Sequence, residues 1–365
     1  MHIGIIGGGQ LGMMLTQAAH KLNHKVTILD PSVNCSAGLI ADKQIVAKFN
    51  NERALESLAS MVDVLTYEFE NIDYQLIKKL AKKYYIPQGF LPLKYSQQRF
   101  VEKTQAVNCG LNTNKFTKIN TIEELNKAVQ EFGYPCVLKT CRWGYDGKGQ
   151  YVIRSVDDLK KASELLNVEC LLEEYIDFDI EASVLIIRDL TGHIITYPAA
   201  LNQHKNNILF KSTWLNNADI NHKLQKAASD LMLKSDLFGI LVIEFFIKDQ
   251  EIYFNEMAPR PHNSFHASIE GCNISQFEAL IRVITKMDIP PIKLEKPTVM
   301  FNVLGQDLKP TINYLSKNKV NATLHDYHKN EIKENRKMAH LTFYNTDIAK
   351  LNSEVSDYLR EVYGE

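Results

Sequence analysis

The sequence has no long hydrophobic run, no recognisable secretory signal and no CxxC pair of cysteines. Apolar stretches such as GILVIEFF are too short to cross a bilayer, and the opening MHIGIIGGG has the character of a β-strand. The six cysteines are scattered, which favours small buried side chains in a reducing compartment over a disulfide framework or a zinc site. These absences predict a cytoplasmic protein with no membrane partner.

The chain also lacks an excess of charge of either sign, since its formal net charge is -1 over 365 residues. It gives no electrostatic reason to expect a nucleic acid partner, and an anionic substrate has to be held by local basic clusters. A composition of 45% hydrophobic and 23% charged residues is typical of a folded protein. This length accommodates two or three domains.

Strand-like and helix-like segments alternate in the N-terminal part of the chain. His2–Ile6 and Val26–Leu29 are apolar strands and Leu11–Leu22 has a helical pattern, which predicts an α/β fold with a parallel sheet. Turn-forming residues at 87–92 and the pair Pro290-Pro291 are predicted boundaries. They divide the chain into an N-terminal domain (1–92), a central domain (93–290) and a C-terminal domain with β-like runs (291–365).

A glycine-rich turn lies between the first predicted strand and the first predicted helix. The residues from Gly7 to Gly12 fit GxGxxG, and Asp30 follows the second strand. In this arrangement amides at a helix N-terminus bind a pyrophosphate and the acid binds a ribose. Because any phosphate can use such a turn, a dinucleotide, a sugar phosphate and no ligand remain alternatives at this point.

A second glycine-rich segment connects two predicted strands. Lys139 ends the first strand, and the loop from Gly144 to Gln150 carries three glycines and Lys148. Its backbone amides can fold over phosphate oxygens while Lys148 supplies positive charge. The loop is not a P-loop, because no Gly-Lys-Ser/Thr opens a helix. A phosphate-binding loop is favoured over a solvated hairpin tip.

Two carboxylates are predicted to face each other across a β-hairpin. Glu244 lies in one apolar strand and Glu256 in the next. A buried carboxylate pair is costly unless a cation neutralises it, and Mg²⁺ held with Asn255 and nucleotide phosphates meets this need. The alternative is a salt bridge for each carboxylate, most directly to Arg260. Arg260 and His262 also suit a small oxyanion such as bicarbonate.

These residues together resemble the ATP-grasp superfamily and, within it, the N5-carboxyaminoimidazole ribonucleotide synthetase family. Six motifs follow the family's order over nearly the whole chain, namely GGGQLG at 7–12, TYEFEN at 66–71, GYDGKGQ at 144–150, NEMAPRPHNS at 255–264, SQFE at 275–278 and RKMAH at 336–340. The resemblance implies an ATP-grasp fold with a biotin-carboxylase-like N-terminal domain, a lid at about 115–177 and a small β-rich C-terminal domain. It also assigns the first glycine turn to the ribonucleotide substrate instead of NAD.

The resemblance further implies the ligands of each residue and a homodimeric state. ATP is expected to contact Arg99, Lys103, Lys139, Gly144, Tyr145, Asp146, Gly147, Lys148, Gly149, Gln150, Glu173, Glu174, Tyr175, Ile176, Glu181, His204, Asn255 and Glu256. The aminoimidazole ribonucleotide is expected to contact Gln10, Leu11, Glu68, Tyr145, Lys329, Arg336 and Lys337. Magnesium is expected at Glu244 and Glu256. Left without the resemblance, the basic tract at 328–340 would be interpreted as a solvated charged face.

The implied reaction is carboxylation of an amine with ATP and bicarbonate, through carboxyphosphate, in purine biosynthesis. The implied catalytic residues are Asp146, Lys148, Arg260 and His262, with Asp146 as the base for the amine proton. A related alternative is another ATP-grasp ligase, such as the formate-dependent glycinamide ribonucleotide transformylase. A nicotinamide oxidoreductase and a non-catalytic nucleotide-binding regulator are alternatives from other classes, and both leave the carboxylate pair unexplained.

The chain departs from the family's usual pattern at a few positions. Glycine is usual where this sequence has Phe265, Asn335 and Ala339, and a cation is common at Cys141. Asparagine tolerates a left-handed backbone, whereas alanine is unfavourable wherever φ has to be positive. Phe265 is expected to narrow the bicarbonate pocket. None of these departures removes a proposed catalytic group.

Overall fold

The computed structural model describes residues 1–142, 144, 148–214 and 218–365. Its N-terminal elements are β1 (His2–Ile6), α1 (Gln10–Lys21), β2 (Lys25–Asp30), β3 (Lys43–Val46), α2 (Glu52–Met61), β4 (Val64–Tyr67) and α3 (Tyr74–Leu80). The strands form the predicted parallel sheet, in the order β3-β2-β1-β4. Successive β1 side chains point to opposite faces, so Ile5 packs toward α1 and Ile6 toward α2. Both faces are therefore covered by helices.

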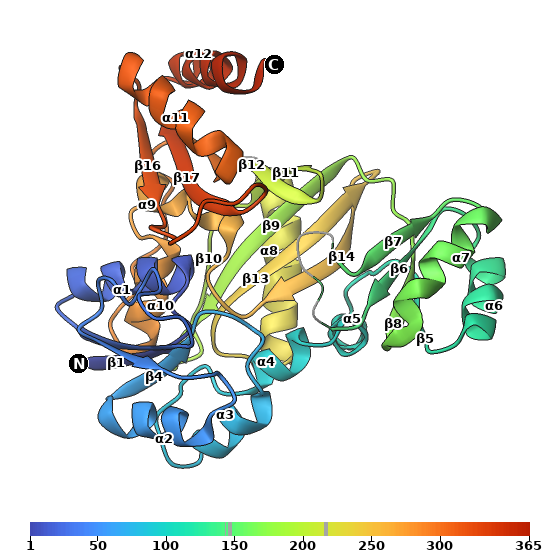
Figure 1. Cartoon of the computed structure of the whole chain (residues 1–365), viewed down its shortest axis with the longest axis horizontal. Helices are drawn as coiled ribbons and strands as arrows, with labels where there is room; N and C mark the ends of the chain where they lie inside the picture. Colours follow the sequence, from blue (N-terminus) through green and yellow to red (C-terminus); the bar gives the residue numbers. More distant parts are fainter. Residues whose placement is uncertain (143, 145–147, 215–217) are drawn as a thin grey trace.

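Two helices, α4 (Leu91–Ser96) and α5 (Arg99–Asn108), lead to a small antiparallel sheet with its own core. Its elements are β5 (Phe116–Ile119), α6 (Ile122–Phe132), β6 (Cys136–Thr140), β7 (Gln150–Ile153), α7 (Leu159–Ala162) and β8 (Cys170–Glu174). The strand order is β5-β8-β6-β7. We call this unit the lid sheet. It projects from one side of the molecule (Figure 1).

The central elements are β9 (Ile180–Arg188), β10 (Ile194–Thr196), β11 (Ala200–Lys205), β12 (Ile208–Trp214), α8 (Ala218–Lys234), β13 (Gly239–Lys248), β14 (Glu251–Ala258), α9 (Ser268–Gly271) and α10 (Gln276–Ile284). Alternate residues of β9 enter different cores: Ile186 packs with α8, and Ile187 packs with α10 and α1. Because both faces of β9 and β13 are covered, these strands are hydrophobic almost throughout.

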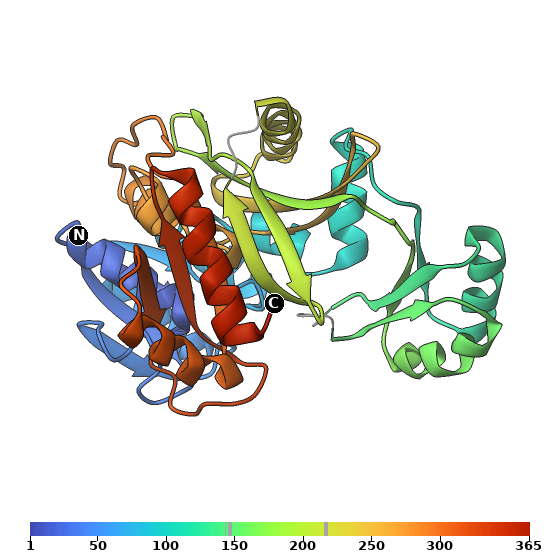
Figure 2. The same ribbon diagram turned by 90° about the horizontal axis from the view of Figure 1, so that it is seen from above.

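The C-terminal elements are β15 (Thr298–Leu304), α11 (Gly305–Lys317), β16 (Ala322–Asp326), β17 (Lys337–Tyr344) and α12 (Ile348–Tyr358). The sequence did not predict α11. β15 pairs with β12, so the C-terminal strands extend the central sheet in the order β14-β13-β9-β11-β12-β15-β17-β16, with β10 beside β9. Figure 2 shows these strands and α12 lying over the N-terminal domain. Every helix in the described part of the chain is too short or too polar to span a bilayer.

Candidate active site

The amides of the first glycine turn are already bound by carboxylates. Gly8 N donates to Asp30 Oδ2 (2.9 Å), while Gly9 N and Gly12 N donate to the two oxygens of Glu68 (2.9 and 3.2 Å). A dinucleotide pyrophosphate would have to displace both acids from this helix N-terminus, where a negative charge is stabilised. The turn therefore serves to place Gln10 on a cavity wall, and the oxidoreductase alternative loses its binding site.

The larger of two neighbouring cavities has a volume of about 790 Å³. It lies where the N-terminal domain, the central sheet and the β16–β17 loop meet, and we call it the acceptor cavity. Six residues that the sequence assigned to the ribonucleotide line it together, namely Gln10, Leu11, Glu68, Lys329, Arg336 and Lys337. Lys329 Nζ donates to Gln10 Oε1 at 2.7 Å, which joins residues 319 positions apart. Cys141 and Gly144 also line this cavity.

The second cavity, of about 460 Å³, lies between the lid sheet and the central sheet. We call it the nucleotide cavity. Its lining contains Arg99, Lys139, Lys148, Gln150, Glu173, Glu174, Tyr175, Ile176, Glu181, His204, Asn255 and Glu256. Lys103 and Gly149, which the sequence also assigned to ATP, line neither cavity. Tyr145, Asp146 and Gly147 lie outside the described residues.

The two cavities share a wall. Seven residues line both of them: Arg99, Lys148, Glu244, Glu256, His262, Asn263 and Lys337. A group bound in one cavity can therefore approach a group bound in the other at this wall, where the carboxylate pair and His262 lie. The predicted carboxylates and the predicted oxyanion residue His262 are thus brought to one place by the β13–β14 hairpin and the loop that follows it.

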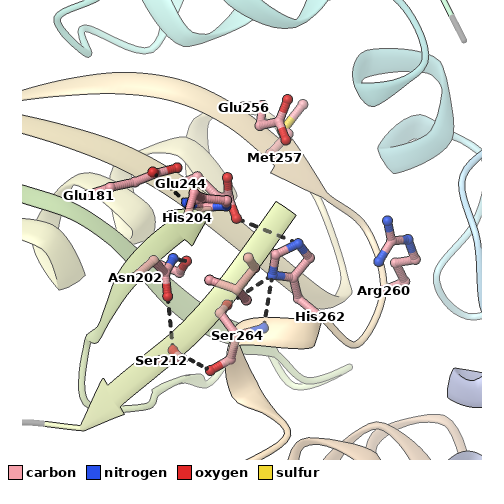
Figure 3. Close-up of polar contacts among 12 residues, drawn as sticks. Glu181, Asn202, His204, Ser212, Glu244, Glu256, Met257, Arg260, His262 and Ser264 are labelled. Carbon is pink, nitrogen blue, oxygen red and sulfur yellow. Dashed lines mark hydrogen bonds and ion pairs between the residues drawn. The ribbon is translucent and has the colours of Figure 1, made fainter. Parts of the chain in front are cut away.

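The predicted hairpin is confirmed, because Glu244 in β13 pairs directly with Glu256 in β14. Glu256 Oε2 accepts from Arg99 Nη1 (2.9 Å), and Glu244 Oε1 lies 3.5 Å from His262 Nε2 (Figure 3). Burial, followed by the charge of Glu256, raises the pKa of Glu244 well above its ordinary value. Burial also opposes ionisation of Glu256, but Arg99 outweighs it and lowers that pKa.

This carboxylate pair fits a magnesium ion that a nucleotide helps to hold. Mg²⁺ usually takes one or two protein carboxylates, with phosphate oxygens and water completing its octahedral shell. Within the described residues, no group of three or more His, Cys, Asp and Glu side chains is arranged to hold a metal, so phosphates would have to supply further ligands. A cation at Glu244 would also offset the burial and the repulsion from Glu256 that together raise the pKa of this carboxyl.

Arg260 does not pair with either of these carboxylates, so the predicted salt-bridge alternative was wrong about its partner. Its guanidinium forms a bidentate ion pair with Glu70, which lies in the loop after β4. Burial opposes the charge on Glu70, but the adjacent Arg260 lowers its pKa. The sequence assigned Glu68 to the ribonucleotide but missed Glu70, and the spacing of two positions in the TYEFEN segment was the local signal that both acids face the cavity.

His262 presents an N–H group toward the shared wall. Ser264 N donates to His262 Nδ1 (3.4 Å), which leaves the ring proton on Nε2, the nitrogen facing Glu244. Burial, with a further contribution from Arg260, lowers the pKa of His262 well below its ordinary value. His262 is therefore a neutral hydrogen-bond donor beside the cationic Arg260.

Lys103 supports the nucleotide cavity from behind. Its ammonium contacts Asn114 Oδ1 (2.8 Å) and Glu173 Oε2 (3.5 Å), and Lys139 Nζ donates to the same Glu173 oxygen at 2.9 Å. Burial alone would raise the pKa of Glu173, but the charges of Lys103 and Lys139 outweigh it and hold the pKa at about 2. Glu173 thus orients Lys139 at the cavity surface.

Replacing Glu173 with Gln is expected to destabilise the fold at neutral pH by about 3–5 kcal/mol, because two buried lysines lose their counter-charge. The wild-type contribution is fully present above pH 4.5 and is lost as the pH falls toward 2, since the unfolded carboxyl binds its proton first. Chemical unfolding across that pH range measures how the free energy of unfolding changes with pH. The free energy of Glu173→Gln should depend less steeply on pH than that of wild type, by up to about 1.4 kcal/mol per pH unit. The same slope for the variant as for wild type would contradict this, and Glu174→Gln is the neighbouring control.

Two of the family departures are explained by the backbone. Asn335 has a φ of 58°, in the left-handed region that asparagine tolerates. Ala339 lies within the extended strand β17, where glycine is not needed. Phe265 is fully buried against Trp214 and Tyr197 and lines neither cavity, so the expectation that it narrows the bicarbonate pocket was wrong.

The fold and the site define an ATP-grasp protein. The family model of the ATP-grasp domain matches residues 104–277. Models of the ribonucleotide synthetase preATP-grasp domain and of the phosphoribosylaminoimidazole carboxylase C-terminal domain match residues 1–90 and 298–354. The chain belongs to the N5-carboxyaminoimidazole ribonucleotide synthase family.

Three relatives support this membership. The N5-carboxyaminoimidazole ribonucleotide synthase of Bacillus subtilis strain 168 is 42% identical over 347 residues, covering 93% of this chain and 90% of the relative. The Staphylococcus aureus N5-carboxyaminoimidazole synthetase complexed with ADP is 38% identical with a TM-score of 0.94, covering 98% and 96% of the two chains. The Aspergillus clavatus synthase in complex with ADP and 5-aminoimidazole ribonucleotide is 28% identical with a TM-score of 0.91, covering 99% and 98%.

Proposed function

We propose that this chain uses ATP and bicarbonate to carboxylate the exocyclic amine of 5-aminoimidazole ribonucleotide, a step of purine biosynthesis. The observation that carries the proposal is the wall shared by the nucleotide cavity and the acceptor cavity. A phosphoryl group transferred from the first cavity and an amine held in the second can meet there. Membership of the synthase family supports the same reaction.

On the nucleotide side, the lining suggests a role for each segment. Arg99, Lys139, Lys148, His204 and Asn255 provide donors for phosphate oxygens. The stretch 173–176 joins the lid sheet to the central sheet, where an adenine ring can lie against the strand end. Glu181 accepts a ribose hydroxyl in this proposal, and the 2.9 Å contact from His204 Nδ1 holds its carboxylate in place. Of the described residues of the glycine loop, Lys148 and Gln150 line the nucleotide cavity and would face the phosphates.

Glu244 and Glu256 would hold magnesium, which neutralises charge on the triphosphate when it is bound. Arg99 keeps Glu256 ionised, and His262 approaches Glu244 from the other side. On the acceptor side, Lys329, Arg336 and Lys337 would bind the ribonucleotide phosphate, since three cations gather on one wall of that cavity. Gln10, Leu11 and Glu68 complete the pocket for the sugar and base.

The proposed reaction has two steps. Bicarbonate oxygen attacks the γ-phosphorus of ATP, the bond to ADP breaks, and carboxyphosphate forms. Arg260 and the N–H of His262 would hold its carboxylate while the substrate amine forms a new bond to carbon and phosphate departs. The amine proton passes to a base, for which we propose Asp146, outside the described residues. Closure of the lid sheet would keep water from the short-lived acyl phosphate.

The direct test is ADP formation from ATP and magnesium, with the ribonucleotide and bicarbonate each added or omitted. ADP formation that requires both, with N5-carboxyaminoimidazole ribonucleotide as product, is the expected result. ADP formation that responds to formate instead of bicarbonate would favour the transformylase alternative. ATP binding with no response to the ribonucleotide would reject the proposed acceptor.

The resemblance also leads us to propose a homodimer that acts in the cytoplasm. Light scattering after size-exclusion chromatography should give twice the mass of the 41.7 kDa chain. A monomeric mass at the protein concentrations used for activity measurements would contradict the dimer without affecting the proposed reaction.

A further inference from the structure

Three imidazole rings, two of them fully buried and that of His325 part-buried, lie against one another beside the acceptor cavity without lining either cavity. The ring centroids of His266 and His340 are 4.6 Å apart, and those of His340 and His325 are 4.5 Å apart with only 12° between the ring planes. His266 and His340 are fully buried. We call these three rings the imidazole column. The proposed reaction steps give none of them a role.

Gln276 connects one end of the column to the backbone N–H and C=O groups of His262. Gln276 Oε1 accepts from His262 N (2.8 Å) and Gln276 Nε2 donates to His262 O (2.8 Å), which fixes the orientation of this amide. The same Nε2 donates to His266 Nδ1 (3.1 Å). His266 therefore carries its proton on Nε2, and the backbone at His262 is held through Gln276 against the column.

The middle of the column is tied to the cations of the acceptor cavity. The hydroxyl of Tyr327 is hydrogen-bonded to His340 Nδ1 (2.9 Å), and the ammonium of Lys329 lies 5.2 Å from the centre of the Tyr327 ring. Lys329 Nζ also donates to Lys337 O at 2.6 Å. The ring of Tyr327 thus supports one of the cations proposed to bind the substrate phosphate.

The far end of the column is anchored by a carboxylate, since His325 Nε2 lies 2.6 Å from Glu270 Oε1. Burial, with a contribution from neighbouring histidines, lowers the pKa values of His266 and His340 well below the ordinary value, so these rings are neutral. Burial raises the pKa of Tyr327 well above its ordinary value, so its hydroxyl keeps its proton. His266 and His340 each make one hydrogen bond through Nδ1, to Gln276 and to Tyr327, which fixes the orientation of each ring.

A metal site does not explain the column, because no group of three or more candidate ligands was found among the described residues. We propose instead that the imidazole column and Tyr327 are positioning residues that set the separation between His262 and Lys329. The inference rests on the proposed function, in which His262 faces the carboxyl donor and Lys329 holds the acceptor's phosphate. A fixed separation places the amine within reach of the reacting carbon.

The test compares two conservative variants, Tyr327→Phe and His340→Asn, with wild type. Tyr327→Phe removes only the hydroxyl, and His340→Asn keeps an acceptor near the position of Nδ1 while removing the ring. We expect the KM for the ribonucleotide to rise about tenfold in Tyr327→Phe. The ratio of ADP to carboxylated product should also rise, since carboxyphosphate then decays before a misplaced amine can capture it, while the KM for ATP stays unchanged.

Two further variants separate positioning from general destabilisation. Leu341→Ala changes the next residue of β17, which faces a different core, and should lower thermal stability without changing the ADP-to-product ratio. The ratio of ADP to carboxylated product should rise more in His340→Leu than in His340→Asn, because leucine keeps no acceptor for the Tyr327 hydroxyl. The inference would be overturned if Tyr327→Phe changed neither the KM for the ribonucleotide nor the ratio of ADP to carboxylated product. It would also be overturned if Leu341→Ala raised that ratio as much as Tyr327→Phe does. Wild type without ribonucleotide-dependent ADP formation would overturn the proposed function itself.

Discussion

Glu244→Gln is expected to lower the turnover number for ADP formation roughly a thousandfold, corresponding to about 4 kcal/mol of lost transition-state stabilisation. The side chain keeps its size but loses the charge that would help Glu256 to hold magnesium. Steady-state ADP formation over a range of magnesium concentrations measures the effect, and the loss should be partly offset at high magnesium.

The same substitution should not weaken the fold in the absence of nucleotide. In wild type, burial and the charge of Glu256 raise the pKa of Glu244, so removal of the charge relieves repulsion instead of breaking a stabilising pair. Thermal unfolding without nucleotide should therefore give a melting temperature no lower than that of wild type. Glu354→Gln, a buried carboxyl on α12, is the matched control and should retain full activity. Full activity of Glu244→Gln would contradict its proposed role.

Arg260→Gln is expected to reduce bicarbonate-dependent ADP formation by roughly a hundred- to a thousandfold, as removal of a preorganised oxyanion donor does elsewhere. ATP binding should be unchanged, because Arg260 does not line the nucleotide cavity. The substitution also leaves the carboxylate of Glu70 without its bidentate partner, which costs about 1–3 kcal/mol for this part-buried pair. Parallel measurements of turnover, nucleotide affinity and unfolding free energy test these three statements.

The double variant Arg260→Gln, Glu70→Gln separates stability from catalysis. Neutralising Glu70 removes the unpaired charge, so the double variant should recover most of the lost unfolding free energy. Its turnover should stay low, because the cation is still missing. Recovery of turnover together with stability would show that Arg260 supports the fold and does not bind the reacting oxyanion.

The sequence predicted the carboxylate pair well because the information was local. Alternation along β13 and β14 and the short turn between them determine which residues face each other, and the pairing of Glu244 with Glu256 followed. The parallel N-terminal sheet was also predictable, since buried strands and amphipathic helices alternate at short separations. The partner of Arg260 was not predictable, because Glu70 lies 190 residues away in another domain.

The sequence by itself thus determined the chemistry available to this protein: the glycine loop, the carboxylate hairpin, the basic C-terminal tract and the family to which their order belongs. Only the tertiary structure decided what those groups contact. In the folded protein, carboxylates accept hydrogen bonds from the amides of the first glycine turn, and Lys103 pairs with Glu173 outside the lining of the nucleotide cavity. Three histidine rings from separate segments also contact one another. Local patterns follow from backbone periodicity, whereas contacts between distant segments depend on how whole domains pack.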